Sequence, residues 1–252
     1  MHDMDRWRGK VALVTGASAG IGRAVSLDLA RAGMRVALLA RRAGRLDAVR
    51  SEIEAGGGEA LCVVADLRVE ADILAAFEAV RARFGGVDVL VNDAGIGRLA
   101  PLMTGATSDF RALLELNVLA VAICTREALA DMRRRGAAGH VVHIASMSAH
   151  RVQLGNGMYA ATKHAVRALT EGLRRELREA GSETRVSAVS PGDVETELKA
   201  VMYGSVEAAR AKAPLYRPLD PRDVSAAVLH ALSAPAHVEV HDILLRPTGQ
   251  PD

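Results

Sequence analysis

The chain has 252 residues, half of them hydrophobic, and its 32 basic and 30 acidic side chains leave a formal net charge of +2. This length supports one domain with a large core, and the scattered, nearly balanced charge excludes a basic surface for nucleic acid or an anionic membrane. No apolar run is long enough to cross a bilayer, and the N-terminus lacks the apolar centre of a secretory signal. We therefore expect a cytoplasmic protein.

Short runs rich in Val, Leu and Ile alternate with longer amphipathic stretches, which is typical of parallel strands joined by helices. The pattern predicts strands at 10–15, 35–40, 60–65, 88–91, 139–145, 184–190 and 241–245, and helices near 21–32, 44–55, 70–84, 108–135, 158–180 and 221–233. Residues 1–252 are thus expected to form a single doubly wound α/β domain of Rossmann type, with about seven parallel strands and helices on both faces. Only 192–220 has no clear pattern, and so long a gap in a compact domain is usually functional.

The two cysteines, Cys62 and Cys124, lie inside apolar runs. This placement predicts two small buried thiols rather than a disulfide, which fits a reducing compartment. We predict no metal site.

The first predicted strand leads into "TGASAGIG", residues 15–22, and then into a helix. Gly16, Gly20 and Gly22 allow a tight turn and a close approach to a pyrophosphate, while the start of the helix offers free N–H groups to phosphate. Three glycines in a turn can be purely structural. Their position between the first strand and the first helix favours a dinucleotide site.

The second predicted strand ends at Arg41 and Arg42, where an NAD site places an acidic residue for the ribose. Two guanidinium groups suit a 2′-phosphate, so the cofactor is predicted to be NADP(H). The alternative is that both arginines are simply solvated at the strand end.

Several motifs occur in a fixed order: "TGASAGIG", Asp66-Leu67, "NDAG" at 92–95, Asn117 in "LNV", Ser146 in "HIASMS", "YAATK" at 159–163 and "SPGDVET" at 190–196. In this order and spacing the chain resembles the short-chain dehydrogenase/reductase family over almost its whole length. Through "CTREAL", "SMSAHRV" and "DILLRPTGQ" it also resembles the subgroup of broad NADP-dependent carbonyl and hydroxysteroid-type reductases. The resemblance implies an oxidoreductase that interconverts a ketone or aldehyde and an alcohol by hydride transfer.

The resemblance assigns the catalytic residues, which are Asn117, Ser146, Tyr159 and Lys163. Tyr159 is the proton donor, and Lys163, four residues later on the same helical face, is expected to lower the pKa of the phenol. The resemblance further implies that Lys163 binds the nicotinamide ribose, that Ser146 holds the substrate oxygen and that Asn117 supports a water in the proton relay. Ser148 competes with Ser146 for its role, but Ser146 directly ends the apolar strand.

The same resemblance gives the predicted cofactor-binding residues: Gly16, Ser18, Gly20, Ile21, Gly22, Arg41, Arg42, Asp66, Leu67, Asn92, Ala94, Gly95, Tyr159, Lys163, Pro191, Gly192, Val194 and Thr196. One position departs from the family pattern, since Asp93 stands where a second Asn is usual. A carboxylate accepts hydrogen bonds but does not donate them as an amide does, so the local bonding there is open.

The substrate is expected to lie under a helical lid within 192–220, where Leu198 and Val201 add to an apolar wall. The predicted substrate residues are Ser148, Leu154, Met158, Met202 and Tyr203. They favour a small-molecule carbonyl substrate of hydrophobic character, unless these side chains only pack the lid onto the core. The alternative substrates are small 3-hydroxy or β-keto acids, held by Arg98, Arg151 or Lys199.

Two other functions fit the sequence less well. A sugar-nucleotide epimerase needs a longer chain with a differently spaced glycine motif, and a non-catalytic NADP-binding protein should lack the Tyr or the Lys. The long predicted helices 108–135 and 158–180 carry broad apolar stripes, and the resemblance implies that they form a four-helix contact in a homodimer or homotetramer.

Overall fold

The computed structural model describes residues 4–212 and 214–251. Within these ranges seven strands form one parallel sheet in the order β3-β2-β1-β4-β5-β6-β7. The strands are β1 (Val11–Thr15), β2 (Arg35–Ala40), β3 (Glu59–Val64), β4 (Val89–Asn92), β5 (His140–Ile144), β6 (Arg185–Pro191) and β7 (Asp242–Leu245). From β1 the strand order runs outward through β2 to β3 on one side, and from β4 it runs outward to β7 on the other. The order therefore switches between β1 and β4. Ligands of open α/β sheets bind at such a switch point, beyond the carboxyl ends of the strands.

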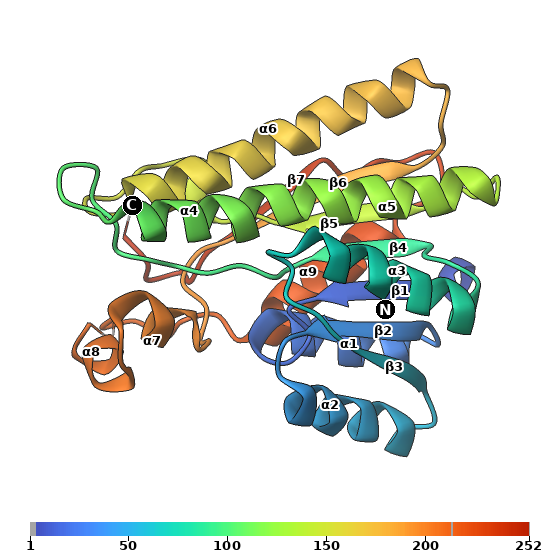
Figure 1. Cartoon of the computed structure of the whole chain (residues 1–252), viewed down its shortest axis with the longest axis horizontal. Helices are drawn as coiled ribbons and strands as arrows, with labels where there is room; N and C mark the ends of the chain where they lie inside the picture. Colours follow the sequence, from blue (N-terminus) through green and yellow to red (C-terminus); the bar gives the residue numbers. More distant parts are fainter. Residues whose placement is uncertain (1–3, 213, 252) are drawn as a thin grey trace.

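Helices cover both faces of the sheet (Figure 1). They are α1 (Gly20–Arg31), α2 (Ala43–Ala55), α3 (Glu70–Phe84), α4 (Thr107–Leu114), α5 (Ala120–Arg134), α6 (Gly157–Glu179), α7 (Leu198–Tyr203), α8 (Val206–Ala211) and α9 (Pro221–Ser233). The buried side chains of α1, α2 and α9 pack on one face, and those of α3, α5 and α6 on the other. This arrangement confirms the predicted single-domain, doubly wound fold.

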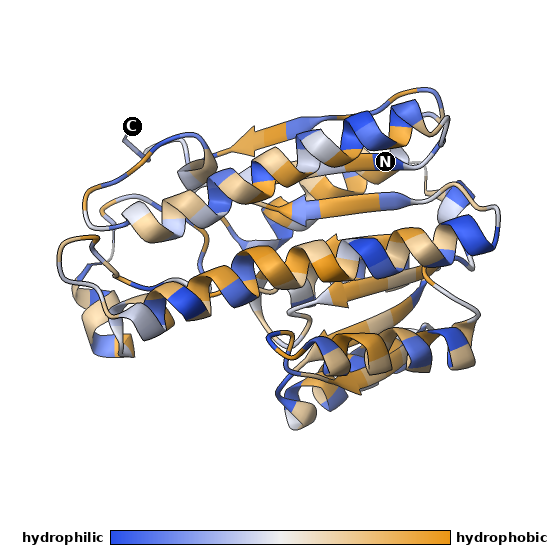
Figure 2. Ribbon diagram, turned by 45° about the horizontal axis from the view of Figure 1, so that its top comes forward, coloured by the Kyte–Doolittle hydropathy of each residue, from blue (hydrophilic) through white to orange (hydrophobic). Residues whose placement is uncertain are grey.

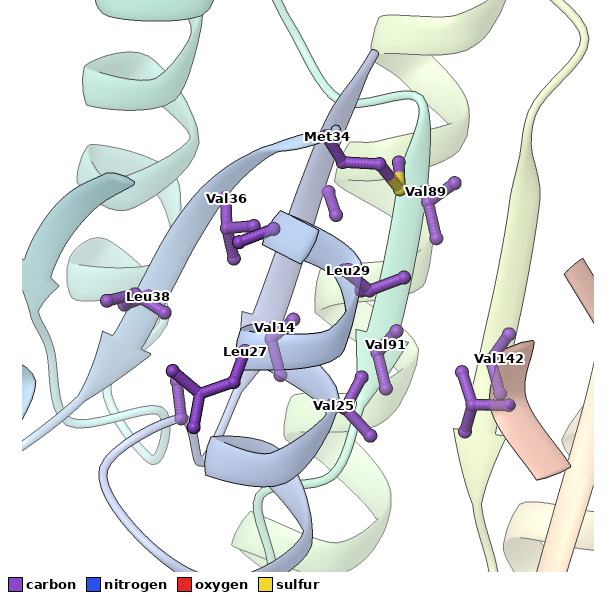
Figure 3. Close-up of a cluster of buried hydrophobic side chains, with 14 of the residues drawn as sticks. Val14, Val25, Leu27, Leu29, Met34, Val36, Leu38, Val89, Val91 and Val142 are labelled. Atoms are coloured by element: carbon purple, nitrogen blue, oxygen red, sulfur yellow. The ribbon is translucent and has the colours of Figure 1, made fainter. Parts of the chain in front are cut away.

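The core divides into two layers because successive side chains of a strand point to opposite faces. Val14 of β1, for example, joins Val36, Val91 and the α1 residues Val25 and Leu29 in one layer (Figure 3). Leu13, one residue earlier, lies in the other layer with α3 and α5. Figure 2 shows the strands in the hydrophobic colour over much of their length, whereas the helices carry both colours. Burial on both faces explains why the strands read as continuous apolar runs.

The helix predicted over 108–135 is divided in the structure. Residues Glu115–Leu119 form a π-helical segment between α4 and α5. Such segments are uncommon and are frequently found at functional sites. Asn117 lies in the middle of this one and is only 1% exposed.

The segment 192–220 contains two short helices rather than the one helix predicted for it. α7 ends at Gly204, whose φ of +85° lies in the left-handed region that glycine adopts readily, and α8 follows. In Figure 1 both helices stand apart from the layered body of the sheet and its helices.

Both cysteines are free thiols; Cys124 is buried and Cys62 is partly buried. Burial raises the pKa of the Cys124 thiol to about 12, as expected for a structural cysteine. None of the helices in the described part of the chain is both long and apolar enough to cross a membrane.

Candidate active site

The turn between β1 and α1 depends on its glycines. Gly16 has a φ of +72°, and a Cβ atom there would lie 3.0 Å from the backbone nitrogen of Ala94. A Cβ atom on Gly22 would lie 2.6 Å from the carbonyl oxygen of Gly16 and 2.7 Å from Oδ2 of Asp93. Side chains at either position would therefore push α1 away from the ends of β1 and β4.

The start of α1 is suited to an anion. Ala19 occupies the N-cap without a side-chain hydrogen bond, and the first turn holds no acidic residue, so its N–H groups and helix dipole favour a phosphate. A cavity of about 290 Å³ opens beside it. Predicted cofactor residues that line this cavity are Gly16, Ser18, Gly20, Ile21, Arg41, Arg42, Asp66, Leu67, Ala94, Gly95 and Thr196. The set fits an adenine dinucleotide.

Positive charge gathers at the end of β2, in the same cavity. Arg41 and Arg42 both line it, and Nη2 of Arg42 donates to Oγ of Ser18 at 3.1 Å. Nη1 of Arg42 also contacts Oε2 of Glu197 at 2.8 Å, and Arg45 contacts the other oxygen of the same carboxylate. Glu197 precedes α7, so a lid carboxylate contacts Arg42, one of the two arginines predicted to bind a 2′-phosphate.

A second cavity, of about 620 Å³, holds the candidate catalytic side chains. β5 leads to Ser146, and the first two turns of α6 present Tyr159 and Lys163, all three of which line this cavity. Tyr159 is hydrogen-bonded to Ser146. Nζ of Lys163 donates to the carbonyl oxygen of Ile144 at 2.9 Å and lies 5.9 Å from the centre of the Tyr159 ring.

Ser146, rather than Ser148, contacts the tyrosine. Ser148 also lines the cavity, but its backbone N–H donates to Oγ of Ser146 at 3.0 Å. This contact, together with the hydrogen bond to Tyr159, holds the Ser146 hydroxyl in one place.

Burial dominates the electrostatics of the pair on α6. It raises the pKa of Tyr159 to about 12, and the hydrogen bond from Ser146 opposes this only in part. It lowers the pKa of Lys163 to about 8, against the attraction of Asp93. The predicted effect of Lys163 on the pKa of Tyr159 is not among the causes of this shift, which are burial, the hydrogen bond from Ser146 and the charge of Asp93.

Asp93, the departure from the family pattern, lies between the two cavities and lines both. Its carboxylate accepts a hydrogen bond from the backbone of Gly22, yet burial raises its pKa to about 7, while Lys163 acts in the opposite direction. The backbone N–H groups of Asp93 and Ala94 both donate to Oγ1 of Thr15 at 3.0 Å. The carboxylate thus finds a backbone donor instead of donating to a carbonyl.

Two predicted asparagines lie beneath the cavities and line neither. Asn117 exchanges two hydrogen bonds of 2.9 Å with the backbone of Ile96, and its Nδ2 donates to Thr162 at 3.2 Å. Asn92 donates to Oγ1 of Thr125 at 3.1 Å. The side chain of Asn117 therefore ties the loop after β4 to α6. Gly22 is likewise outside both cavity walls, packed against Gly16.

Only some of the predicted substrate residues line the larger cavity. Ser148, Leu154, Met202 and Tyr203 line the larger cavity, as do the predicted cofactor residues Pro191, Gly192 and Val194. Met158 does not, because it packs against the cluster of Ala100, Leu113 and Tyr159. Val201 lines the smaller cavity instead of the larger one, while Leu198 reaches both.

Sequence reasoning missed several residues of the larger cavity. Asn156, Tyr216, Arg246 and Gln250 line it. Tyr216 belongs to the predicted lid segment, and Arg246 and Gln250 belong to "DILLRPTGQ", but nothing in those segments marks them as site residues. Asn156 carried a usable signal, because an asparagine just before the predicted helix, three residues from Tyr159, is a common N-cap and lies near the catalytic motif. Arg98 lies outside the cavity wall, with its Nε 3.7 Å from a carboxylate oxygen of Asp109.

A glycine turn at the switch point of a parallel sheet, beside a buried tyrosine and lysine, defines a nicotinamide-dependent oxidoreductase. The family described as short chain dehydrogenase matches residues 10–204, and the chain belongs to this family of enzymes that act on CH–OH groups. It is 44% identical to "Dehydrogenase/reductase SDR family member 11" of Homo sapiens, over 98% of this chain and 97% of the relative. It is 43% identical to "Farnesol dehydrogenase" of Aedes aegypti, over 98% and 99% of the two chains.

Solved structures agree with this assignment. The closed form of a serine dehydrogenase complexed with NADP⁺ matches with a TM-score of 0.89 and 29% identity, over 96% of each chain. Similar structures hold either NADP or NAD, which supports a nicotinamide cofactor here.

Proposed function

We propose that this protein is an NADP(H)-dependent carbonyl reductase that interconverts hydrophobic ketones or aldehydes and the corresponding alcohols. The observation that carries the proposal is that Ser146, Tyr159 and Lys163 line one cavity next to the glycine turn, with Nζ of Lys163 5.9 Å from the centre of the Tyr159 ring. The pair Arg41 and Arg42, with Ser18, supports NADP(H) over NAD(H), because guanidinium groups bind phosphate in a bidentate manner.

The bound cofactor supplies the hydride. Ser146 holds the substrate oxygen, and Tyr159 donates the proton that the developing alkoxide needs. A pKa raised to about 12 keeps the phenol of Tyr159 protonated at neutral pH, which is the form that donates. Lys163 is anchored by Ile144 at 2.9 Å, so its charge stays beside the tyrosine as the proton leaves. Asn117 positions α6 through Thr162.

The substrate class follows from the wall of the larger cavity. Leu154, Leu198 and Met202 contribute apolar surface from the 151–156 loop and from the lid at about 192–220. The relative named farnesol dehydrogenase also supports an apolar alcohol or carbonyl compound. In a series of ketones of increasing length assayed with NADPH, kcat/KM should rise by up to about ten-fold for each added methylene. A flat series would contradict the hydrophobic site.

Small hydroxy acids are the competing substrate class. Arg151 and Arg246 line the larger cavity and offer positive charge to a carboxylate, and the structural neighbour named serine dehydrogenase belongs with this alternative. Lys199 is less suited, because its Nζ lies 2.6 Å from a carboxylate oxygen of Asp193. If turnover requires a carboxylate and is lost in Arg151→Ala, the hydroxy-acid function replaces the ketone function. A non-catalytic NADP-binding role is disfavoured because Asn117, Ser146, Tyr159 and Lys163 are all present.

We further propose that the protein is a cytoplasmic homodimer or homotetramer. A mainly apolar groove of about 940 Å³ runs between α5 and α6 and includes Val121, Leu129 and Leu169. Two copies of this face would bury it as a four-helix contact. Light scattering at micromolar concentration should then give at least twice 26.6 kDa, and a monomer would refute the assembly.

A further inference from the structure

Asn156 occupies the N-cap position of α6 but does not cap the helix. Asparagine at this position usually accepts a hydrogen bond from a backbone N–H of the first turn. Here that bond is absent, although the residue is only 6% exposed. Among the described residues, its Oδ1 has no hydrogen-bond partner. Buried polar atoms are almost always paired, so an unpaired amide at this place points to a ligand.

Asn156 lies in the cavity where the proposed proton transfer takes place. It lines the same cavity as Tyr159 and Lys163. Tyr159 and Lys163, four residues apart, share one face of α6. Asn156 directly precedes this helix at its N-cap, three residues before Tyr159. The backbone of Asn156 is anchored at both ends, because its N–H donates to Gln153 at 3.1 Å and its carbonyl accepts from Ala160 at 2.9 Å. These bonds fix the point from which the side chain reaches the cavity that holds the proton donor.

We propose that Asn156 binds a hydroxyl group of the substrate, close to the reacting carbonyl, so that hydroxyketones are preferred over plain ketones. An amide presents an oxygen acceptor on one side and an NH₂ donor on the other, and a half-turn about χ2 exchanges them. A hydroxyl group donates and accepts, so it pairs with either orientation. The inference rests on the proposed carbonyl reductase and narrows its substrate class.

A plain ketone would leave the amide of Asn156 desolvated and unpaired. Sites built to hydrogen-bond a substrate group discriminate strongly against analogues that lack it, because the site then keeps an unsatisfied polar atom. Asn156 thus adds a buried polar contact point to a cavity wall that also contains the apolar side chains of Leu154, Leu198 and Met202.

The test compares two ketones of nearly the same shape, 2-hydroxyacetophenone and propiophenone, in which a hydroxyl replaces a methyl group. The ratio of their kcat/KM values should fall about ten-fold or more in Asn156→Leu, which has a similar shape but no polar atom. Because each ratio is compared between variants, the intrinsic reactivity of the two ketones cancels. Asn156→Asp keeps an acceptor oxygen and should retain more of the ratio than Asn156→Leu.

Gln153→Leu is the matched control, since Gln153 is an exposed polar residue of the same cavity wall. It should keep the wild-type ratio. An unchanged ratio in Asn156→Leu, or an equal fall in Gln153→Leu, would overturn the proposal.

A binding measurement separates this inference from the proposed function. With the enzyme saturated with NADPH, calorimetry should show tighter binding of 1-phenyl-1,2-ethanediol than of 1-phenyl-1-propanol, and Asn156→Leu should remove the difference. If no ketone is reduced but this difference is found, the proposed function fails and the Asn156 site stands. If ketones are reduced while the diol has no advantage, the Asn156 site fails and the reductase stands.

Discussion

The two walls of the larger cavity are built in different ways. On the wall formed by β5 and the start of α6, Tyr159 and Lys163 are 8% and 6% exposed, and each has a hydrogen-bond partner. Another wall comes from α7 of the lid. Both α7 and α8, which follows it outside this cavity wall, are six residues long, and neither has a buried residue. Helices this short are not stable alone, so α7 and α8 depend on their contacts with the rest of the chain.

The lid carries several ion pairs, and those of Glu197 are the more exposed. Glu197 bridges Arg42 and Arg45, with all three side chains between 44% and 50% exposed, and Lys199 pairs with Asp193. Exposed ion pairs contribute about 0–1 kcal/mol each. The first wall therefore fixes the chemistry, whereas the second can move or change sequence at little energetic expense, which is how one scaffold serves many substrates.

The largest difference between the walls should appear when each loses one phenolic hydroxyl. Tyr159→Phe should lower kcat by about a hundred-fold or more, as expected for loss of a general acid, with NADPH affinity nearly unchanged. Tyr203→Phe removes a hydroxyl from the lid side of the same cavity and should change kcat only a few-fold. Steady-state kinetics and fluorescence titration of NADPH measure both. Comparable losses in the two variants would mean that the proton does not come from Tyr159.

The next effect concerns the arginines at the end of β2 that are predicted to bind the cofactor. Arg41→Asp replaces an attraction for the 2′-phosphate by a repulsion, so the ratio of kcat/KM for NADPH to that for NADH should fall by about ten- to a hundred-fold. Arg45→Asp makes the same change of charge on a side chain outside the cofactor cavity wall, and its effect should be smaller. If Arg45→Asp shifts the ratio as much as Arg41→Asp, net charge rather than a local contact sets the preference.

The two walls also differ in how far sequence alone predicts them. The strands and the glycine turn were predictable because buried parallel strands give continuous apolar runs and because the turn needs a positive φ at Gly16. Ser146, Tyr159 and Lys163 came from motif spacing, and the structure brings them into one cavity.

The lid was predicted less well, because its residues have few buried partners to impose a pattern. The break between α7 and α8 coincides with Gly204, whose φ is positive, and Val201 lines the smaller cavity, which apolar periodicity does not distinguish from the larger one. The spacing of apolar residues in the sequence does not reveal the π-helical segment that contains Asn117. The raised pKa of Tyr159 was missed because motif spacing carries no information about burial.

Asp93 follows β4 and lines both cavities. Replacing it should change the stability of the protein more than replacing an exposed lid residue does. Its pKa is raised to about 7, so folding costs free energy whenever the carboxyl must be ionised. This cost is absent below the unfolded pKa of 3.8, grows between pH 3.8 and about 7, and stays constant above that range. Asp93→Asn should therefore be stabilised relative to the parent protein at pH 8 but not at pH 4.

The shift of about three units sets an upper bound of ~4 kcal/mol for Asp93→Asn, and loss of the charge beside Lys163 offsets part of it. We expect a net gain on the order of 1–2 kcal/mol at pH 8, or a few degrees in Tm. Thermal unfolding at the two pH values measures this. A gain of equal size at both would show that ionisation of Asp93 is not its cause.

The smallest effect is expected at Glu197, where the lid contacts the arginines that follow β2. Its carboxylate contacts Arg42 and Arg45, and both arginines lower its pKa, so it is ionised at neutral pH and stands where a 2′-phosphate would have to compete with it. Because the pair is exposed, the competition is weak, and Glu197→Gln should tighten NADPH binding only about two- to five-fold. NADH lacks the phosphate and should bind as before.

Glu195→Gln removes the same charge two residues earlier on the exposed segment and should leave both dissociation constants unchanged. Titrations with 2′,5′-ADP and 5′-AMP isolate the contact from the nicotinamide. Equal tightening of both nucleotides would mean that Glu197 acts through the general field of the lid and not through Arg42.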